Sequence, residues 1–129
     1  MPNKKTPTIL VAEDDHFLAK IYKIKLAKEN INAVIANDGD TALEKIKEVK
    51  PALILLDMVL PGKDGFEVLS TIKADKELRD IPVIILSNLG QDSDIAKGKE
   101  LGALDYLVKS DISIHEIINK VKILLDGKR

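Results

Sequence analysis

The sequence contains no cysteine, and this absence excludes both a disulfide framework and thiol chemistry. Net charge is almost absent as well, because 20 basic residues stand against 21 acidic ones and leave a net charge of -1, which gives no basic field for DNA or a membrane surface. No apolar run approaches the roughly 18 to 20 residues of a membrane span, and the N-terminal MPNKKTPT lacks the apolar core of a signal peptide. We therefore expect a cytoplasmic protein that binds neither nucleic acid nor membrane.

Aromatic residues are scarce, at 3% of the chain, and no glycine-rich phosphate loop follows the first apolar run, which argues against a flavin-binding module. What the chain does have is 45% hydrophobic and 32% charged residues in 129 positions, a size and composition typical of one globular domain. We expect a single domain over residues 1–129, without an internal repeat or linker.

Short apolar runs alternate with longer helical patterns along the chain. The runs predicted as strands are 8–12, 32–36, 52–57, 81–87 and 104–108. Several are apolar without alternation, which is typical of parallel strands covered by helices on both faces. Helical patterns lie at 16–28, 38–50, 65–74 and 93–102 and from Ser113 onward. Five βα units result, so the sequence predicts a three-layer, doubly wound α/β domain.

Two of the predicted helices carry clear end signals. Asp38 is a candidate N-cap of the second helix, and Pro51 would end that helix. Ser113 and Glu116 have the spacing of a capping box ahead of the last helix. The fourth helical pattern is weaker because Gly98 interrupts it.

Chemically active side chains stand where the predicted strands end. They are Glu13 and Asp14 after the first strand, Asp57 after the third, Ser87 at the end of the fourth and Lys109 after the fifth. In doubly wound sheets ligands bind outside the carboxyl ends of the strands, where the strand order reverses. Three carboxylates placed together there would raise one another's pKa unless a cation neutralised them, and oxygen ligands favour Mg²⁺. The sequence therefore predicts a magnesium site at this edge.

The stretch ALILLDMVLPGKDG shows how such a site is built. Its apolar run would deliver Asp57 to the rim of the sheet, and Pro61 and Gly62 would turn the chain so that the carboxylate stays accessible. Taken singly, an acidic residue is often a solvated loop residue or a helix N-cap, as we expect for Asp15. The joint placement of five such residues at the strand ends favours a functional site.

With these motifs the sequence resembles the receiver domains of two-component response regulators. The likeness covers nearly the whole chain, from ILVAEDD through LILLDMVLPGKDGFEVL and IPVIILS to GALDYLVK. It implies a flavodoxin-like (βα)5 sheet with strand order 2-1-3-4-5 and Asp57 as the phosphoacceptor. The implied site residues are Glu13, Asp14, Asp57 and the main-chain carbonyl of Val59 for Mg²⁺, Lys109 for the phosphate, and Ser87 and Tyr106 as switch residues.

The resemblance also implies how the domain works. A sensor histidine kinase or a phosphotransfer protein would donate the phosphoryl group, and the chain would catalyse only its own phosphorylation and dephosphorylation. Phosphorylation would draw Ser87 inward and make space for Tyr106 to rotate, which would change the surface of the fourth helix, fifth strand and fifth helix toward a downstream protein target. The chain would be a monomer or a phosphorylation-dependent dimer, and it leaves no room for an output domain, as expected for a stand-alone receiver or a piece of a longer protein.

Several positions depart from the pattern of the family or bear on its variation. Ser110 follows Lys109 where the family usually has proline, so we predict a trans bond there, because a non-proline cis bond costs roughly 3–4 kcal/mol. Val59 and Leu89, expected to flank the path of the hydrolytic water, are apolar, and Asn88 would crowd the same entrance. We therefore predict slow loss of the phosphoryl group.

On the first helix, Phe17, Ile21 and Ile24 recur at helical spacing and are predicted to lie mostly in the core, although a kinase bundle would be expected to dock on this helix.

Other function classes fit less well. A haloacid dehalogenase-type phosphohydrolase would need a second aspartate two residues after Asp57, where Val59 stands. A P-loop nucleotide-binding protein would need G-x-x-x-x-G-K-[ST], which is absent from the sequence. A receiver fold kept as an interaction module without phosphorylation stays open as the alternative, although no acceptor-site group is missing.

Overall fold

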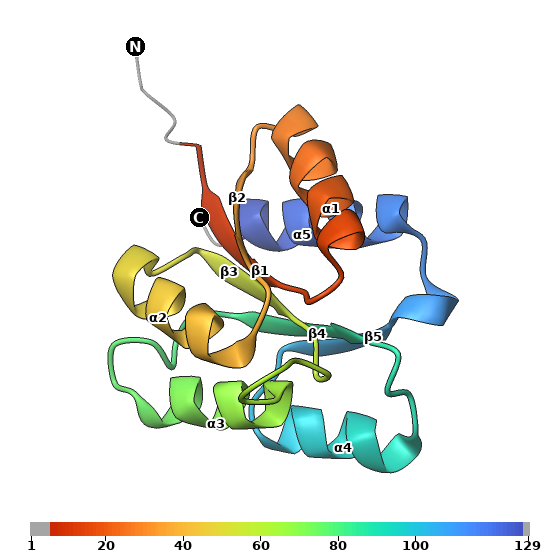
Figure 1. The fold of residues 1–129 in the computed structure, drawn as a ribbon. Helices are drawn as coiled ribbons and strands as arrows, with labels where there is room; N and C mark the ends of the chain where they lie inside the picture. Colours follow the sequence, from red (N-terminus) through yellow and green to blue (C-terminus); the bar gives the residue numbers. More distant parts are fainter. Residues whose placement is uncertain (1–5, 128–129) are drawn as a thin grey trace.

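Strands and helices alternate strictly along the chain in the computed structural model, which describes residues 6–127 (Figure 1). The strands are β1 (Thr8–Ala12), β2 (Asn32–Ala36), β3 (Leu53–Leu56), β4 (Val83–Ser87) and β5 (Asp105–Val108). The helices are α1 (His16–Lys28), α2 (Gly39–Val49), α3 (Gly65–Ala74), α4 (Asp92–Glu100) and α5 (Ile114–Gly127), with a short 3-10 helix at Lys109–Asp111. No helix in residues 6–127 combines the length and the apolar character needed to cross a membrane.

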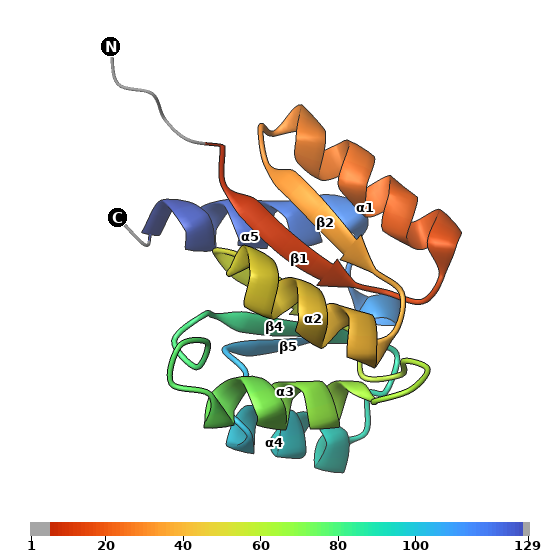
Figure 2. The same cartoon turned by 60° about the vertical axis from the view of Figure 1, so that its left-hand side comes forward.

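The five strands form one parallel sheet in the order β2-β1-β3-β4-β5, which confirms the predicted topology. The chain enters at β1 and moves outward to β2 (Figure 2), and it then returns past β1 to β3 and continues to β4 and β5 (Figure 1). The strand order therefore reverses between β1 and β3. Loops leaving the carboxyl ends of these two strands diverge, and this leaves a crevice between them.

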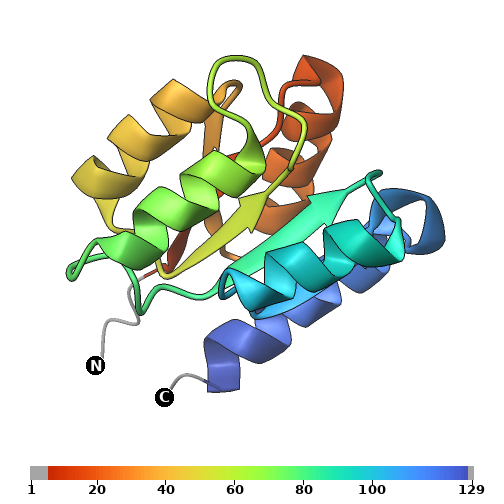
Figure 3. The same cartoon turned by 90° about the horizontal axis from the view of Figure 1, so that it is seen from below.

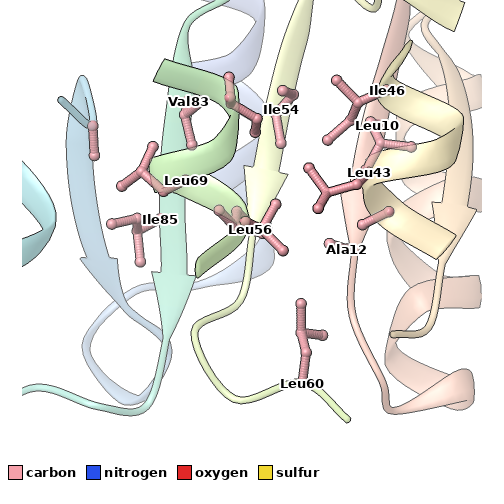
Figure 4. Packing of buried hydrophobic residues seen from close by; sticks show 14 of the residues in the cluster. Leu10, Ala12, Leu43, Ile46, Ile54, Leu56, Leu60, Leu69, Val83 and Ile85 are labelled. Atoms are coloured by element: carbon pink, nitrogen blue, oxygen red, sulfur yellow. The ribbon is translucent and has the colours of Figure 1, made fainter. Parts of the chain in front are cut away.

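Helices cover both faces of the sheet, with α1 and α5 on one face and α2, α3 and α4 on the other (Figures 1 and 3). All four residues of β3 are buried, because Leu53 and Leu55 face the first pair of helices while Ile54 and Leu56 face the other three. In Figure 4, Leu43 of α2 lies beside the β1 side chains in the larger of the two cores. Burial on both faces explains why the strands lack apolar alternation.

The predicted helix caps are present. The Asp15 carboxylate accepts hydrogen bonds from the Phe17 and Leu18 amides at the start of α1, each 3.0 Å long. Asp38 accepts from the Thr41 amide at 2.7 Å. At the start of α5, the Ser113 amide donates to the Glu116 carboxylate at 2.9 Å, and the Glu116 amide donates to the Ser113 hydroxyl at 3.1 Å. Each side chain satisfies an amide that the helix itself leaves unpaired.

The prediction for the first helix was wrong for its core face. Phe17 is 75% exposed and Ile24 is 48% exposed, while Ile21 is only half-buried. The buried stripe of α1 is instead formed by Ala19, Tyr22 and Leu26. Both stripes have helical spacing, so periodicity alone could not decide which of them faces the sheet.

Candidate functional site

Three carboxylates gather at the carboxyl edge of the sheet, where β1 and β3 end. The Glu13 amide donates to the Ala36 carbonyl of β2 at 2.9 Å, and the Asp57 amide donates to the Ala12 carbonyl of β1 at 3.1 Å. These bonds extend the strand ladders by one residue and set the direction of both side chains. Glu13 is 3% exposed and Asp57 is 5% exposed, whereas Asp14 is exposed to solvent. One oxygen from each carboxylate lies within 4.8 Å of the others.

Lys109 follows β5, which lies two strands away from β3, and its side chain reaches this acidic cluster (Glu13, Asp14 and Asp57). Its ammonium donates hydrogen bonds to Glu13 Oε1 at 2.5 Å and to Asp57 Oδ2 at 2.8 Å. Burial raises the pKa of Glu13, and the bond from Lys109 offsets only part of that rise. Burial alone would lower the pKa of Lys109, but its hydrogen bonds to Asp57 and Glu13 outweigh that effect and raise it. One ammonium therefore serves two buried carboxylates, and the cluster keeps an excess of negative charge.

The loop between β3 and α3 holds the Asp57 carboxylate in place. The Val59 amide donates to Asp57 Oδ1 at 3.1 Å. The chain then turns at Gly62, whose φ of 75° lies in the left-handed region that favours glycine. At Gly65 a Cβ would lie 2.3 Å from the Asp57 carbonyl oxygen, so only glycine lets α3 begin so close behind Asp57. The predicted Pro-Gly turn is thus part of a loop that folds back onto the strand end.

Ser87 and Tyr106 are linked through the main chain of Leu89. The fully buried Ser87 hydroxyl accepts a hydrogen bond from the Leu89 amide at 3.3 Å. The Tyr106 hydroxyl donates to the Leu89 carbonyl, and the Tyr106 side chain is buried. In this structure the Tyr106 ring is buried while the Ser87 hydroxyl keeps its bond from the Leu89 amide, and the rotation of Tyr106 on phosphorylation stays a prediction. Burial, with the nearby charges of Asp94 and Asp57, raises the pKa of the Tyr106 phenol.

A model of the response regulator receiver domain matches residues 9–122. The chain belongs to this family. Receiver domains are signalling modules of two-component response regulators and act as phosphoacceptors. The sequence-based resemblance is therefore confirmed at the level of the family.

Known receivers of similar sequence support this assignment. The phosphate regulon transcriptional regulatory protein PhoB of Escherichia coli K12 is 35% identical over 117 residues, which cover 91% of this chain and 51% of PhoB. The chain thus spans about half the length of the curated relatives it matches. The receiver domain of Francisella response regulator 1452 is 35% identical, with a TM-score of 0.86 and coverage of 95% of this chain and 99% of that one. The BeF3-activated receiver domain of Klebsiella pneumoniae RstA is 29% identical, with a TM-score of 0.82 and coverage of 90% and 96%.

One open cleft of the receiver contains nearly the whole predicted site. Its lining residues include Glu13, Asp14, Asp57, Val59, Ser87, Asn88 and Lys109. Leu89 is not among them, so of the two apolar residues predicted to flank the water path only Val59 lines the cleft. Leu89 contacts the cleft residue Ser87 through its main-chain amide. Residues 6–127 contain no cis peptide bond, so the Lys109–Ser110 bond is trans, as predicted.

The acidic cluster fits magnesium by its chemistry. It offers only oxygen ligands, and three carboxylate oxygens within 4.8 Å can reach one small ion. Receivers generally bind Mg²⁺ at such a pocket. The excess negative charge that Lys109 leaves uncompensated would provide the electrostatic attraction for the cation.

Sequence reasoning missed two residues beside the site. Asn37 donates from its side-chain amide to the Glu13 carbonyl at 2.9 Å, and its position after β2 at the same edge could have revealed it. Tyr22 of α1 is buried next to Glu13 and Asp57, and burial raises its pKa to about 12. No sequence signal distinguishes Tyr22 from an ordinary core residue of an amphipathic helix.

Proposed function

We propose that this receiver accepts a phosphoryl group on Asp57 from a phosphohistidine of a sensor histidine kinase or a phosphotransfer protein. The observation that carries the proposal is the position of the Asp57 carboxylate, which lies at the strand end with the Lys109 ammonium 2.8 Å away and Ser87 in the same cleft. The carboxylate is fixed by the ladder bond of its own amide and by the Val59 amide, so it is held for in-line attack.

The chemistry follows from these groups. An Asp57 oxygen attacks phosphorus while the bond from phosphorus to the donor imidazole nitrogen breaks. The nitrogen keeps the electron pair and takes up a proton, and the product is an aspartyl phosphate. Lys109 neutralises charge on the transferred oxygens, and the Ser87 hydroxyl donates a hydrogen bond to one of them. Mg²⁺, held by Glu13, Asp14, Asp57 and the Val59 carbonyl, would supply further charge neutralisation when bound.

The output would be a change at the α4, β5 and α5 surface. If the Ser87 side chain rotates so that its oxygen moves toward a phosphoryl oxygen, its bond from the Leu89 amide breaks, and the Leu89 carbonyl that Tyr106 binds becomes free to shift. A downstream protein target would read the altered surface, and the chain would act as a monomer or as a phosphorylation-dependent dimer. We also propose that residues 1–129 form a single receiver domain.

The phosphodonor would approach over α1. Phe17 and Ile24 leave an apolar stripe exposed on this helix, and Leu18 of the same helix lines the cleft that contains Asp57. A partner helix that packs on this stripe would lie next to the phosphoacceptor. Phe17→Ser should therefore slow transfer from a kinase but leave phosphorylation by a small donor unchanged.

Incubation with Mg²⁺ and acetyl phosphate, followed by intact mass measurement, tests the proposal. We expect one added phosphoryl group in the wild type and in the exposed control variant Asp92→Asn, and none in Asp57→Asn. An unmodified wild type in this assay would refute the proposal and favour an interaction module that works without phosphorylation.

A further inference from the structure

Helix α4 is attached to the rest of the receiver by few buried residues. Of its nine residues, only Gly98 is buried. Ile95 and the following Leu101 are half-buried, and most of the other residues of the helix are polar and exposed. Figure 3 shows α4 lying along the sheet beside β5, the strand that carries Tyr106. The position of α4 therefore depends strongly on what Gly98 packs against.

Gly98 packs against the Tyr106 ring and leaves no room for a side chain of its own. A Cβ at this position would lie 2.6 Å from Ile85 Cδ1, and 2.9 Å and 3.1 Å from Cδ2 and Cε2 of Tyr106. Contacts below 3 Å would force one of these side chains to move. A glycine in the interior of a helix is also unfavourable relative to alanine. α4 therefore contains glycine, a poor helix former, at the position where the Tyr106 ring packs against it.

The other end of the same ring is tied to the cleft. Its hydroxyl donates to the Leu89 carbonyl, and the Leu89 amide donates to the Ser87 hydroxyl at 3.3 Å. Ser87, Leu89, Tyr106 and Gly98 therefore form a continuous chain of contacts from the phosphoacceptor cleft to the middle of α4.

We propose that Gly98 is a positioning residue for Tyr106, and that its missing Cβ is what allows the ring to lie inward against α4. The ring and the helix then occupy one shared space, so that a ring moving outward leaves a gap that α4 must fill. Gly98 determines how readily Tyr106 takes the inward position, and through Leu89 it influences the phosphoacceptor cleft. The part that concerns phosphorylation rests on the function proposed above, whereas the part that concerns the position of Tyr106 does not.

The test uses protein labelled with 3-fluorotyrosine and the variant Gly98→Ala. The chain contains two tyrosines, so two fluorine resonances are expected, and Tyr106→Phe assigns them. In Gly98→Ala the Tyr106 resonance should move toward that of an exposed tyrosine and gain a larger shift between H2O and D2O. The buried Tyr22 should keep its resonance and serves as the internal reference.

Two further variants separate the contact with the Tyr106 ring from the contact with Ile85. Ile85→Val removes Cδ1, the atom closest to the added methyl group, so Ile85→Val alone should leave Tyr106 inward. The double variant Ile85→Val, Gly98→Ala should still expose Tyr106, because the contact with the ring remains. A Tyr106 resonance that stays unchanged in folded Gly98→Ala would overturn the proposal. If Gly98→Ala does not fold, the triple variant Ile85→Val, Tyr106→Leu, Gly98→Ala, which removes both close contacts, must restore folding, and failure to do so would equally overturn the proposal.

The rate of phosphorylation by acetyl phosphate provides the second readout. Because hydrogen bonds link Tyr106 through Leu89 to Ser87, a variant that disfavours the inward ring should change the rate of phosphorylation about fivefold, at the low end of typical coupling between two sites. The same substitution should have no effect in an Ile85→Val, Tyr106→Leu background, where both close contacts are gone. A rate effect that persists in that background would contradict the proposal. Failure of the wild type to be phosphorylated would refute the proposed function instead, and the fluorine measurement would still decide the role of Gly98.

Discussion

Replacement of Lys109 by methionine tests the electrostatics of the cleft directly. The ammonium lies 2.5 Å from Glu13 and 2.8 Å from Asp57, and both carboxylates are buried. Methionine keeps most of the apolar stem, so the change removes the charge without opening a large cavity. Loss of one partner from a buried ion pair typically costs roughly 3–5 kcal/mol. Because the Lys109 side chain is 15% exposed and Glu13 can take up a proton, we expect the lower end, about 3 kcal/mol of unfolding free energy.

Urea unfolding at neutral pH in metal-free buffer measures this loss. Lys120→Met is the matched control, since its ammonium pairs with Asp105 at 3.4 Å on the surface, with the two side chains 46% and 34% exposed. A pair of that kind contributes about 0–1 kcal/mol. Addition of Mg²⁺ should stabilise Lys109→Met more than the wild type, because the cation replaces the missing positive charge. Equal losses in the two variants would refute the idea that Lys109 stabilises the acidic cluster.

The same variant has a predictable pH dependence. Burial raises the pKa of Glu13 above its ordinary value of 4.5, and removal of Lys109 should raise it further. A carboxyl group with a raised pKa in the folded state favours folding below its unfolded pKa, and this contribution is lost as the pH rises through the folded value. The stability deficit of Lys109→Met should therefore be small near the ordinary pKa of Glu13 and grow toward neutral pH. A deficit that stays constant over this range would contradict the burial argument.

Three further predictions concern residues around the cleft. Asp14→Asn should raise the melting temperature in metal-free buffer, because it removes one of three mutually repelling carboxylates, and should weaken Mg²⁺ binding in calorimetry; unchanged affinity would exclude Asp14 as a ligand. Asp15→Ala should lower the free energy of unfolding, measured in urea, by about 1 kcal/mol through loss of the α1 N-cap; a decrease below a few tenths of a kcal/mol would mean that water replaces the cap. Val59→Asn should speed loss of phosphate from the phosphorylated receiver in excess Mg²⁺, whereas Leu89→Gln should change it little; no acceleration in Val59→Asn would show that water access at this position does not set the lifetime.

Much of the fold could be predicted because strand burial leaves a strong signal. β1 and β2 match the predicted ranges to the residue, and the other strands are shorter than predicted by one or two residues. The gathering of Glu13, Asp57 and Lys109 followed from topology alone, since parallel strands place their carboxyl ends at one edge. The strand order came from the family resemblance and was confirmed by the sheet.

The remaining features depend on distances that a pattern does not contain. α1 has two stripes with helical spacing, and only packing against β1 and β2 selects the one with Tyr22 over the one with Phe17. The interruption of the fourth helical pattern at Gly98 was visible in the sequence, but its reason was not, because the Tyr106 ring that needs the space comes from another part of the chain. Loop residues such as Leu89 act through their main chain, which side-chain identity does not reveal.

The two ends of the proposed signalling route differ in how firmly they are held. Glu13 and Asp57 are each fixed by a ladder hydrogen bond to a neighbouring strand, so the acceptor site moves only if the sheet itself is disturbed. α4 has one buried residue, and that residue is a glycine. A domain of this size is stable by roughly 5–15 kcal/mol in total. Because the sheet is close-packed on both faces, a displacement of a few tenths of an ångström costs far more there than in a helix with a single buried residue. A change at Ser87 should therefore relax by movement of α4, which makes hydrogen exchange in α4, rather than in the sheet, the place where phosphorylation should be seen first.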